Sequence, residues 1–177
     1  MKPAADRPWS VVVARAEVPE TGRRFVLSAD EDSRARIAKI AGLNGLPRLE
    51  AIFDVTRQAG EGLRVRGEVS ATVTQTCVVT LELVENEVRE AVDLDFVPAA
   101  EGSNGEVDVA NDNGPETMAN GMVDLGAIAV EFLMLGLDPY PRKPGVVFEP
   151  LPGADDGRNR PFAALAALKK ATGAKDG

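Results

Sequence analysis

The sequence predicts an α+β fold, in which a mainly antiparallel β-sheet that could curl toward a barrel is covered by two or three packed helices. The main observation is residues 63–73, where apolar and polar side chains alternate over six consecutive steps. This alternation is typical of a long strand with one buried face. Similar segments follow after short turns, so sequential strands should pair antiparallel. Apolar side chains at helical spacing before and after this region predict the covering helices.

The first part of the chain is expected to contain two short strands and one helix. The strands are predicted over residues 11–18 and 24–27. The helix should extend over residues 30–41, because Ser28 or Asp30 can cap its first turn. Its apolar side chains lie on one face, which should pack against the sheet.

The central part, residues 49–97, is expected to form an antiparallel meander. Its strands are predicted at residues 49–56, from residue 63 through Leu83, and at 88–96, with turns at 58–62 and 85–87. The segment 99–121 differs, because it is rich in Gly, Asn, Asp and Glu and has no aromatic residue. It should be a flexible acidic loop, with a possible short edge strand near residues 107–109.

The last part is expected to contribute two helices. The first should extend over residues 125–137, capped by Asp124 and followed by an extended proline-rich segment at 139–144. A shorter one should begin at Pro161 and end near residue 168. The chain therefore divides into residues 1–98, 99–121 and 122–172, which we expect to form a single domain.

The composition argues against most kinds of enzyme. The chain contains no histidine, which removes the commonest general base and metal ligand. The single cysteine, Cys77, excludes an internal disulfide, and with carboxylates alone it would make an unusual zinc site. We therefore expect no enzymatic activity, no cofactor and no metal. No secretory or membrane-spanning segment is recognised, so the expected location is the cytoplasm and no membrane partner is expected.

Charge is unevenly distributed along the chain. The formal net charge is −8, and residues 81–140 hold one arginine against fourteen acidic residues. Overall acidity argues against the broad basic field of a typical nucleic-acid binder. The acidic stretch 82–116 could attract a basic partner protein, although solubilising charge is the simpler interpretation.

Two stretches share motifs with a known bacterial family. From Arg66 to Glu82, a Gly-x-hydrophobic-x-hydrophobic strand leads to a cysteine step at Cys77. From Val123 to Pro141, an Asp-Leu-Gly motif at the start of a predicted helix is followed by a Pro-x-Pro motif after the end of that helix. In this order and spacing the motifs resemble the YceD family, the large ribosomal RNA subunit accumulation proteins, over about residues 10–170. The resemblance implies a role in accumulation of 23S rRNA and in assembly of the large ribosomal subunit, without enzymatic activity.

The chain departs from the family pattern at its cysteines. Thr80 stands where the second cysteine of the Cys-x-x-Cys step is expected, and the cysteines that many relatives carry near the C-terminus are absent. A metal or redox role of those cysteines is thus not available here. The resemblance then implies that any shared function does not depend on them.

Five residues are candidates for contact with a partner. Arg64 and Arg66 lie on one face of the long strand and could contact phosphates, or could pair with Glu68, Asp93 and Asp95 on a solvated sheet face. Tyr140, Arg142 and Lys143 combine an aromatic ring with cations, and could stack on a base or dock on a protein.

Three functional hypotheses follow. The first is a ribosome biogenesis factor that binds a large-subunit precursor, through a basic ribosomal protein or through rRNA. The second is an RNA-binding module that uses the arginine-bearing sheet face. The third is an enzyme that uses carboxylates alone, for which a pocket would have to gather two or more acidic side chains; we expect no such pocket. The sequence leaves the oligomeric state open.

Overall fold

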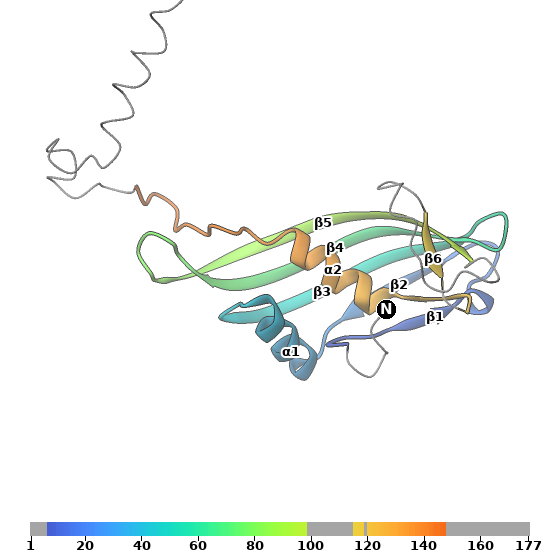
Figure 1. Ribbon diagram of the computed structural model, residues 1–177, viewed down its shortest axis with the longest axis horizontal. Coiled ribbons are helices and arrows are strands. Elements are labelled where there is room, and N and C mark those ends of the chain that lie inside the picture. Colours follow the sequence, from blue (N-terminus) through green and yellow to red (C-terminus); the bar gives the residue numbers. More distant parts are fainter. Residues whose placement is uncertain (1–6, 99–114, 119, 148–177) are drawn as a thin grey trace, which may run out of the picture. The chain divides into compact units, whose positions relative to one another are not determined.

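The structure is a computed structural model that describes residues 7–98, 115–118 and 120–147. All its helices and strands lie in one compact unit that ends at Pro144, and residues from Gly145 onward belong to a second unit. The predicted α+β composition is confirmed, with two helices and mostly antiparallel sheets (Figure 1). No closed barrel occurs among the described residues, because the main sheet keeps two free edges.

The main sheet has five strands, and a second sheet has two. In spatial order the main sheet consists of β2 (Arg23–Ser28), β3 (Gly45–Arg57), β4 (Leu63–Thr76), β5 (Leu83–Pro98) and β6 (Glu116–Met118). Its first four strands are antiparallel neighbours, whereas β6 pairs parallel to β5. The small sheet pairs β1 (Val12–Ala14) with β7 (Met122–Asp124). The long strands β4 and β5 form the hairpin that dominates the fold.

The strand register separates an inner, apolar face from an outer, polar face. On the inner face Phe53 lies opposite Gly67, which lies opposite Val92. A Cβ atom on Gly67 would approach the carbonyl oxygen of Ile52 to 1.9 Å, so only glycine fits there. The next residues along each strand point to the outer face, as the two-residue period requires.

Both helices pack on the inner face. Helix α1 (Glu31–Ala41) begins at Asp30, whose carboxylate accepts the N–H of Ser33 at 2.7 Å, and ends at Gly42. Helix α2 is Leu125–Leu135. Their buried side chains, such as Ile37 of α1, join the same core as the inner-face residues. Of the two predicted caps of α1, Asp30 and not Ser28 is the N-cap, and the predicted capping of α2 by Asp124 is confirmed.

Asp124 ties the N-terminal segment to the start of α2. Its carboxylate accepts hydrogen bonds from Arg7 (2.6 Å), Ser10 (2.8 Å), the backbone of Val11 (2.8 Å) and the backbone of Ala127 (3.2 Å). The neighbouring Gly126 lets the chain pass closely, since a Cβ there would lie 2.9 Å from the Val11 nitrogen. In this Asp-Leu-Gly motif the aspartate caps α2 and the leucine is buried in the core. The glycine allows the N-terminal segment to pass close to the helix backbone.

The predicted boundaries differ from the structure in several places. The strand predicted at 11–18 is only β1, followed by a 3₁₀ turn, η2 (Arg15–Glu17). Strand β3 begins before the predicted residue 49, and α2 ends before the predicted residue 137. The described end of the predicted loop 99–121 contains β6. The predicted strand near 107–109 and helix near 161–168 lie outside the described residues.

The turn between β4 and β5 was predicted in the wrong place. It lies at residues 77–82, while residues 85–87 belong to β5. The polar run at 85–87 looks like a turn because Asn86 interrupts the apolar alternation, yet Asn86 lies half-buried opposite Val73. The true turn contains neither glycine nor proline, so its sequence carries no turn signal. The division into 1–98, 99–121 and 122–172 as a single domain stays a prediction.

Candidate partner-binding surfaces

Arg64 and Arg66 lie on the outer face, where both bind one carboxylate. Arg64 donates to Asp93 through Nε (2.9 Å) and Nη2 (3.0 Å), and Arg66 Nε donates to Asp93 Oδ1 at 3.1 Å. A second carboxylate, Asp95, lies 3.5 Å from Arg64. The hydrogen bond from Arg64, followed by that from Arg66, lowers the pKa of Asp93 to about 2. Asp93 therefore holds both arginines at neutral pH.

The other outer-face arginines are also paired with acids. Arg24 makes a bidentate contact with Asp54, with distances of 2.8 and 2.7 Å. The remaining pairs are Arg48 with Glu87 at 2.6 Å and Glu50 at 3.0 Å, and Arg89 with Glu68 at 3.9 Å. Because these arginines are paired with carboxylates, the outer face corresponds more closely to a solvated surface with balanced charges than to a surface that binds phosphates. A phosphate would have to displace a carboxylate to reach each guanidinium.

A pocket of about 680 Å³ lies at the end of the outer face near β6. Its lining includes Arg64, Asp93, Asp95 and Glu116. The expectation that no pocket gathers two or more acids is therefore wrong. Asp93 is nevertheless a poor proton acceptor near neutral pH, because its pKa is so low. Burial, and after it the charge of Glu131, raises the pKa of Glu116.

The other candidate contact residues, Tyr140, Arg142 and Lys143, lie at the opposite end of the long hairpin. Here the turn residues 77–82 are covered by residues 138–143, and we call these two segments together the hairpin end. The backbone N–H of Val78 donates to the carbonyl of Pro141 at 2.9 Å. Gln75 Nε2 donates to the carbonyl of Asp138 at 3.0 Å, and Lys143 Nζ donates to Glu82 at 2.9 Å. These contacts fix the proline-rich segment on the hairpin.

Cys77 is buried within the hairpin end. It lies just after β4 rather than in a strand, and the backbone N–H groups of Thr80 and Lys143 donate to its sulfur at 3.5 and 3.4 Å. Hydrogen bonding by Thr80, and then by Lys143, lowers the pKa of the thiol to about 6, whereas burial acts in the opposite direction. Cys77, Val84 and Pro141 are each buried, and none of them is a member of the main hydrophobic core. Across the described ranges, no three His, Cys, Asp or Glu side chains gather as they would around a metal ion.

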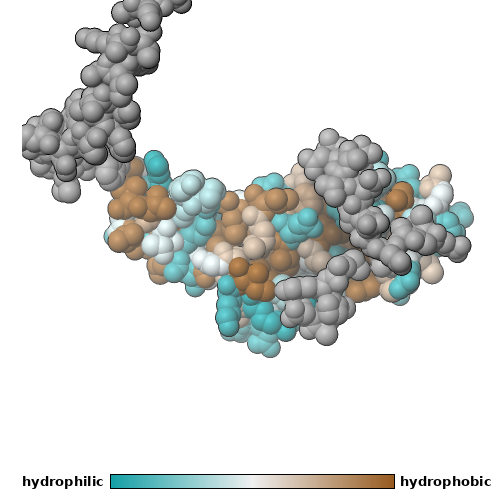
Figure 2. Space-filling view, viewed as in Figure 1, coloured by the Kyte–Doolittle hydropathy of each residue, from teal (hydrophilic) through white to brown (hydrophobic). Residues whose placement is uncertain are grey.

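Large apolar side chains are exposed at the hairpin end. Leu81, Tyr140 and Val78 are 77%, 69% and 46% exposed, and the adjoining first residue of β5, Leu83, is 64% exposed. Figure 2 shows hydrophobic side chains gathered at this end of the β4–β5 hairpin. Leu81 also has a φ of +60°, which is unfavourable for leucine. In the sequence, Leu81 and Leu83 continue the apolar alternation of the long strand. The alternation therefore predicts that both side chains lie on the buried face of that strand, and it does not reveal this exposed surface.

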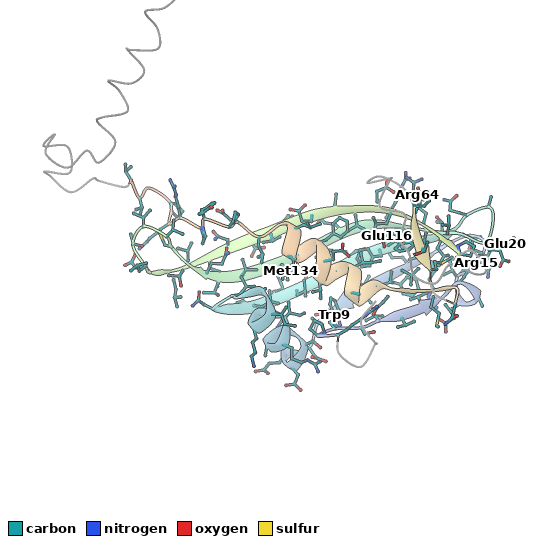
Figure 3. All side chains as sticks on the ribbon, in the orientation of Figure 1. Trp9, Arg15, Glu20, Arg64, Glu116 and Met134 are labelled. Carbon is teal, nitrogen blue, oxygen red and sulfur yellow. The ribbon has the colours of Figure 1, made fainter. Side chains whose placement is uncertain are left out.

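The five predicted contact residues therefore do not form one site. Arg64 is the second residue of β4 and lies near one end of the long hairpin (Figure 3). Tyr140, Arg142 and Lys143 belong to the segment that is hydrogen-bonded to Cys77 and Val78, just past the other end of β4. The twelve residue-to-residue steps along β4 from Arg64 to Thr76 correspond to about 40 Å. Arg142 and Tyr140 are exposed, and Lys143 is paired with Glu82. The structure thus brings together only the hairpin-end residues.

These features define an α+β protein whose long hairpin presents apolar side chains at its end. The family model described as "Large ribosomal RNA subunit accumulation protein YceD" matches residues 65–169, which is more than half of the chain. The chain belongs to this family. The match includes the whole hairpin end and α2, and begins after β1, β2, β3 and α1. No curated protein and no solved structure matches the chain.

No helix in the described ranges is both long and apolar enough to cross a membrane. Helices α1 and α2 have 11 residues each, whereas a span needs about 20.

Proposed function

We propose that this protein is a ribosome biogenesis factor that acts in the bacterial cytoplasm by binding an assembling large ribosomal subunit. Binding, rather than catalysis, would support accumulation of 23S rRNA. Membership in the large ribosomal RNA subunit accumulation family supports the cellular role. The exposed apolar surface at the hairpin end, which lies wholly within the matched residues, supports binding as the mode of action.

The observation that carries the binding mode is Leu81. A leucine with positive φ costs about 1–2 kcal/mol relative to an ordinary backbone conformation. Its side chain is 77% exposed, so packing within the described unit recovers little of this cost. Strained residues with exposed apolar side chains are typical of contact sites. Hydrogen bonds from Val78 to Pro141 and from Lys143 to Cys77 tie the turn to the proline-rich segment, which restricts the backbone that carries Leu81.

A basic ribosomal protein is the preferred direct partner. The outer face carries five arginines against seven acids, so it presents no positive field to a nucleic acid. Direct RNA contact by Arg64 and Arg66 would require release of Asp93. Local RNA contact through Tyr140 and Arg142 is compatible with this arrangement, because both are exposed at the hairpin end.

The test is complementation of a strain depleted of this protein. Wild-type protein should restore the large-subunit peak in a sucrose gradient and the level of 23S rRNA. The variant Leu81→Asn should fail, because asparagine tolerates positive φ but removes the apolar contact. The matched control is Ile40→Asn, which changes a 60% exposed side chain outside the family match. Normal subunit profiles after depletion would refute the proposed function, and full rescue by Leu81→Asn would refute the hairpin end as its contact site.

A further inference from the structure

The outer face of the sheet contains a hollow of about 200 Å³ near its middle. It is lined by residues of β2, β3 and β4, namely Val26, Leu27, Ser28, Glu50, Ile52, Glu68 and Ser70. None of the five contact residues predicted from the sequence lies in it. The hollow is also separate from the hairpin end, because β4 continues for six residues beyond Ser70.

The hollow arises from the order of large and small side chains in two neighbouring rows across the strands. One row places Val26 opposite Ile52 and Ile52 opposite Glu68. The next row places Ser28 opposite Glu50 and Glu50 opposite Ser70. Because the serines are short, they leave space beside the longer side chains of both rows. The register thus produces a depression without any break in the sheet.

The floor of the hollow is apolar although it faces solvent. Val26 is 73% exposed and Ile52 is 46% exposed. Elsewhere the outer face carries mainly charged residues and hydroxyls, which makes this valine–isoleucine pair unusual. Exposed apolar side chains surrounded by polar residues are typical of binding surfaces.

Two carboxylates border this apolar floor. Within the described part of the chain, Glu68 has one ion pair, a distant one with Arg89 at 3.9 Å, and Glu50 Oε2 contacts Arg48 at 3.0 Å. Neither arginine is among the residues that line the hollow. Both ion pairs are exposed, so exchanging them for another cation costs little free energy.

We propose that the hollow receives a lysine or arginine side chain from a basic protein segment that lies across the outer face. The aliphatic part of such a side chain would cover Val26 and Ile52, while its charged end would bind Glu50 or Glu68. A nucleic acid fits poorly, because its phosphates would meet these carboxylates. The inference rests on the proposed function, since it names the contact made with a basic ribosomal protein.

The test uses the full chain labelled with ¹⁵N and titrated with a decalysine peptide at low salt. Saturable shifts are expected at the amides of Val26, Ile52 and Glu68. The double variant Glu50→Gln/Glu68→Gln should bind about tenfold more weakly, because two charge pairs are lost. The variant Ile52→Thr keeps both carboxylates and a β-branched side chain, yet should also weaken binding by removing apolar contact.

The matched control is Glu20→Gln/Glu85→Gln, which removes the same charge from exposed positions outside the hollow. It should change the affinity less than twofold. Equal weakening by the two double variants, or shifts spread over the whole acidic surface, would overturn the proposal. So would a ten-nucleotide single-stranded RNA that shifts the same amides as strongly as the peptide.

Complementation separates this inference from the proposed function. If Glu50→Gln/Glu68→Gln restores the large subunit fully in the depleted strain, the hollow is not the partner site, although the proposed function stands. If depletion itself leaves 23S rRNA unchanged, the proposed function fails, whereas the peptide titration still decides whether the hollow binds cationic side chains.

Discussion

The backbone N–H of Val78 and the carbonyl of Pro141 form a 2.9 Å hydrogen bond that joins the turn of the long hairpin to the segment after α2. Val78 follows the buried Cys77, whose sulfur accepts the N–H of Lys143 at 3.4 Å. Two consecutive residues of the turn are therefore bound to the proline-rich segment.

Leu81→Asn should leave the free energy of unfolding unchanged or raise it by up to about 1 kcal/mol, because asparagine adopts positive φ at lower cost. Urea denaturation measures this change. The control is Leu83→Asn, which changes an exposed side chain in β5. This variant should lose up to about 1 kcal/mol of unfolding free energy, because asparagine has a lower strand propensity than leucine. A loss above 2 kcal/mol for Leu81→Asn would show that this side chain is packed rather than presented.

Gly67→Ala should destabilise the protein by about 3 kcal/mol or more, because the new Cβ would overlap the Ile52 carbonyl and the strands would have to separate. The comparison is Gly45→Ala, whose Cβ would lie 3.2 Å from the Thr74 hydroxyl. That change should cost less than about 1 kcal/mol, since a side chain can move aside. Thermal or urea unfolding of the two variants measures the difference, and equal costs would contradict the close strand approach at Gly67.

Asp124→Asn should weaken the junction between the N-terminal segment and α2. Burial alone would raise the pKa of Asp124, but hydrogen bonds from Ser10, Val11, Arg7 and Ala127 outweigh it and lower the pKa of this carboxyl from its ordinary value. The carboxylate therefore stabilises the fold above the unfolded-state pKa, and this stabilisation is lost as pH falls through the lower folded-state pKa.

At neutral pH, Asp124→Asn should lose about 1–3 kcal/mol of unfolding free energy. Urea denaturation from pH 7 down to pH 3 should show a smaller dependence on pH below about 4 than in the wild type. The exposed Glu20→Gln is the control and should follow the wild-type curve. An Asp124→Asn curve parallel to that of the wild type would mean that this carboxylate does not govern the acid response.

Asp93→Asn/Asp95→Asn should release the two arginines of the outer face. In a filter-binding titration with 23S rRNA fragments, this variant should bind more tightly than the wild type, with a steeper dependence on salt. The control Glu20→Gln/Glu85→Gln changes the net charge equally but leaves Arg64, Arg66 and Lys143 paired. If Asp93→Asn/Asp95→Asn binds RNA no more tightly than the control, the pairing with Asp93 and Asp95 is not what keeps Arg64 and Arg66 from RNA.

Local features of the fold could be predicted because their causes act within a few residues. The alternation at residues 63–73 defines a strand face, and Asp30 and Asp124 satisfy the first N–H groups of helices that follow at once. The hairpin connection at 58–62 is also confirmed, since glycine permits its backbone conformation. The turn at 77–82 escaped prediction, because its closing hydrogen bonds involve Cys77 and Leu81 rather than typical turn residues.

The candidate surfaces depend on contacts between residues far apart in the chain. The sequence alone determined that Arg64 and Arg66 share one strand face, that histidine chemistry is absent and that Tyr140 lies in a proline-rich segment. Only the tertiary structure decided that Asp93 occupies both arginines and that Pro141 fixes the hairpin end. It also decided that Val26 and Ile52 form the floor of an acid-bordered hollow. The physical reason is that side-chain period is a local property, whereas register and packing across strands are set by the whole sheet.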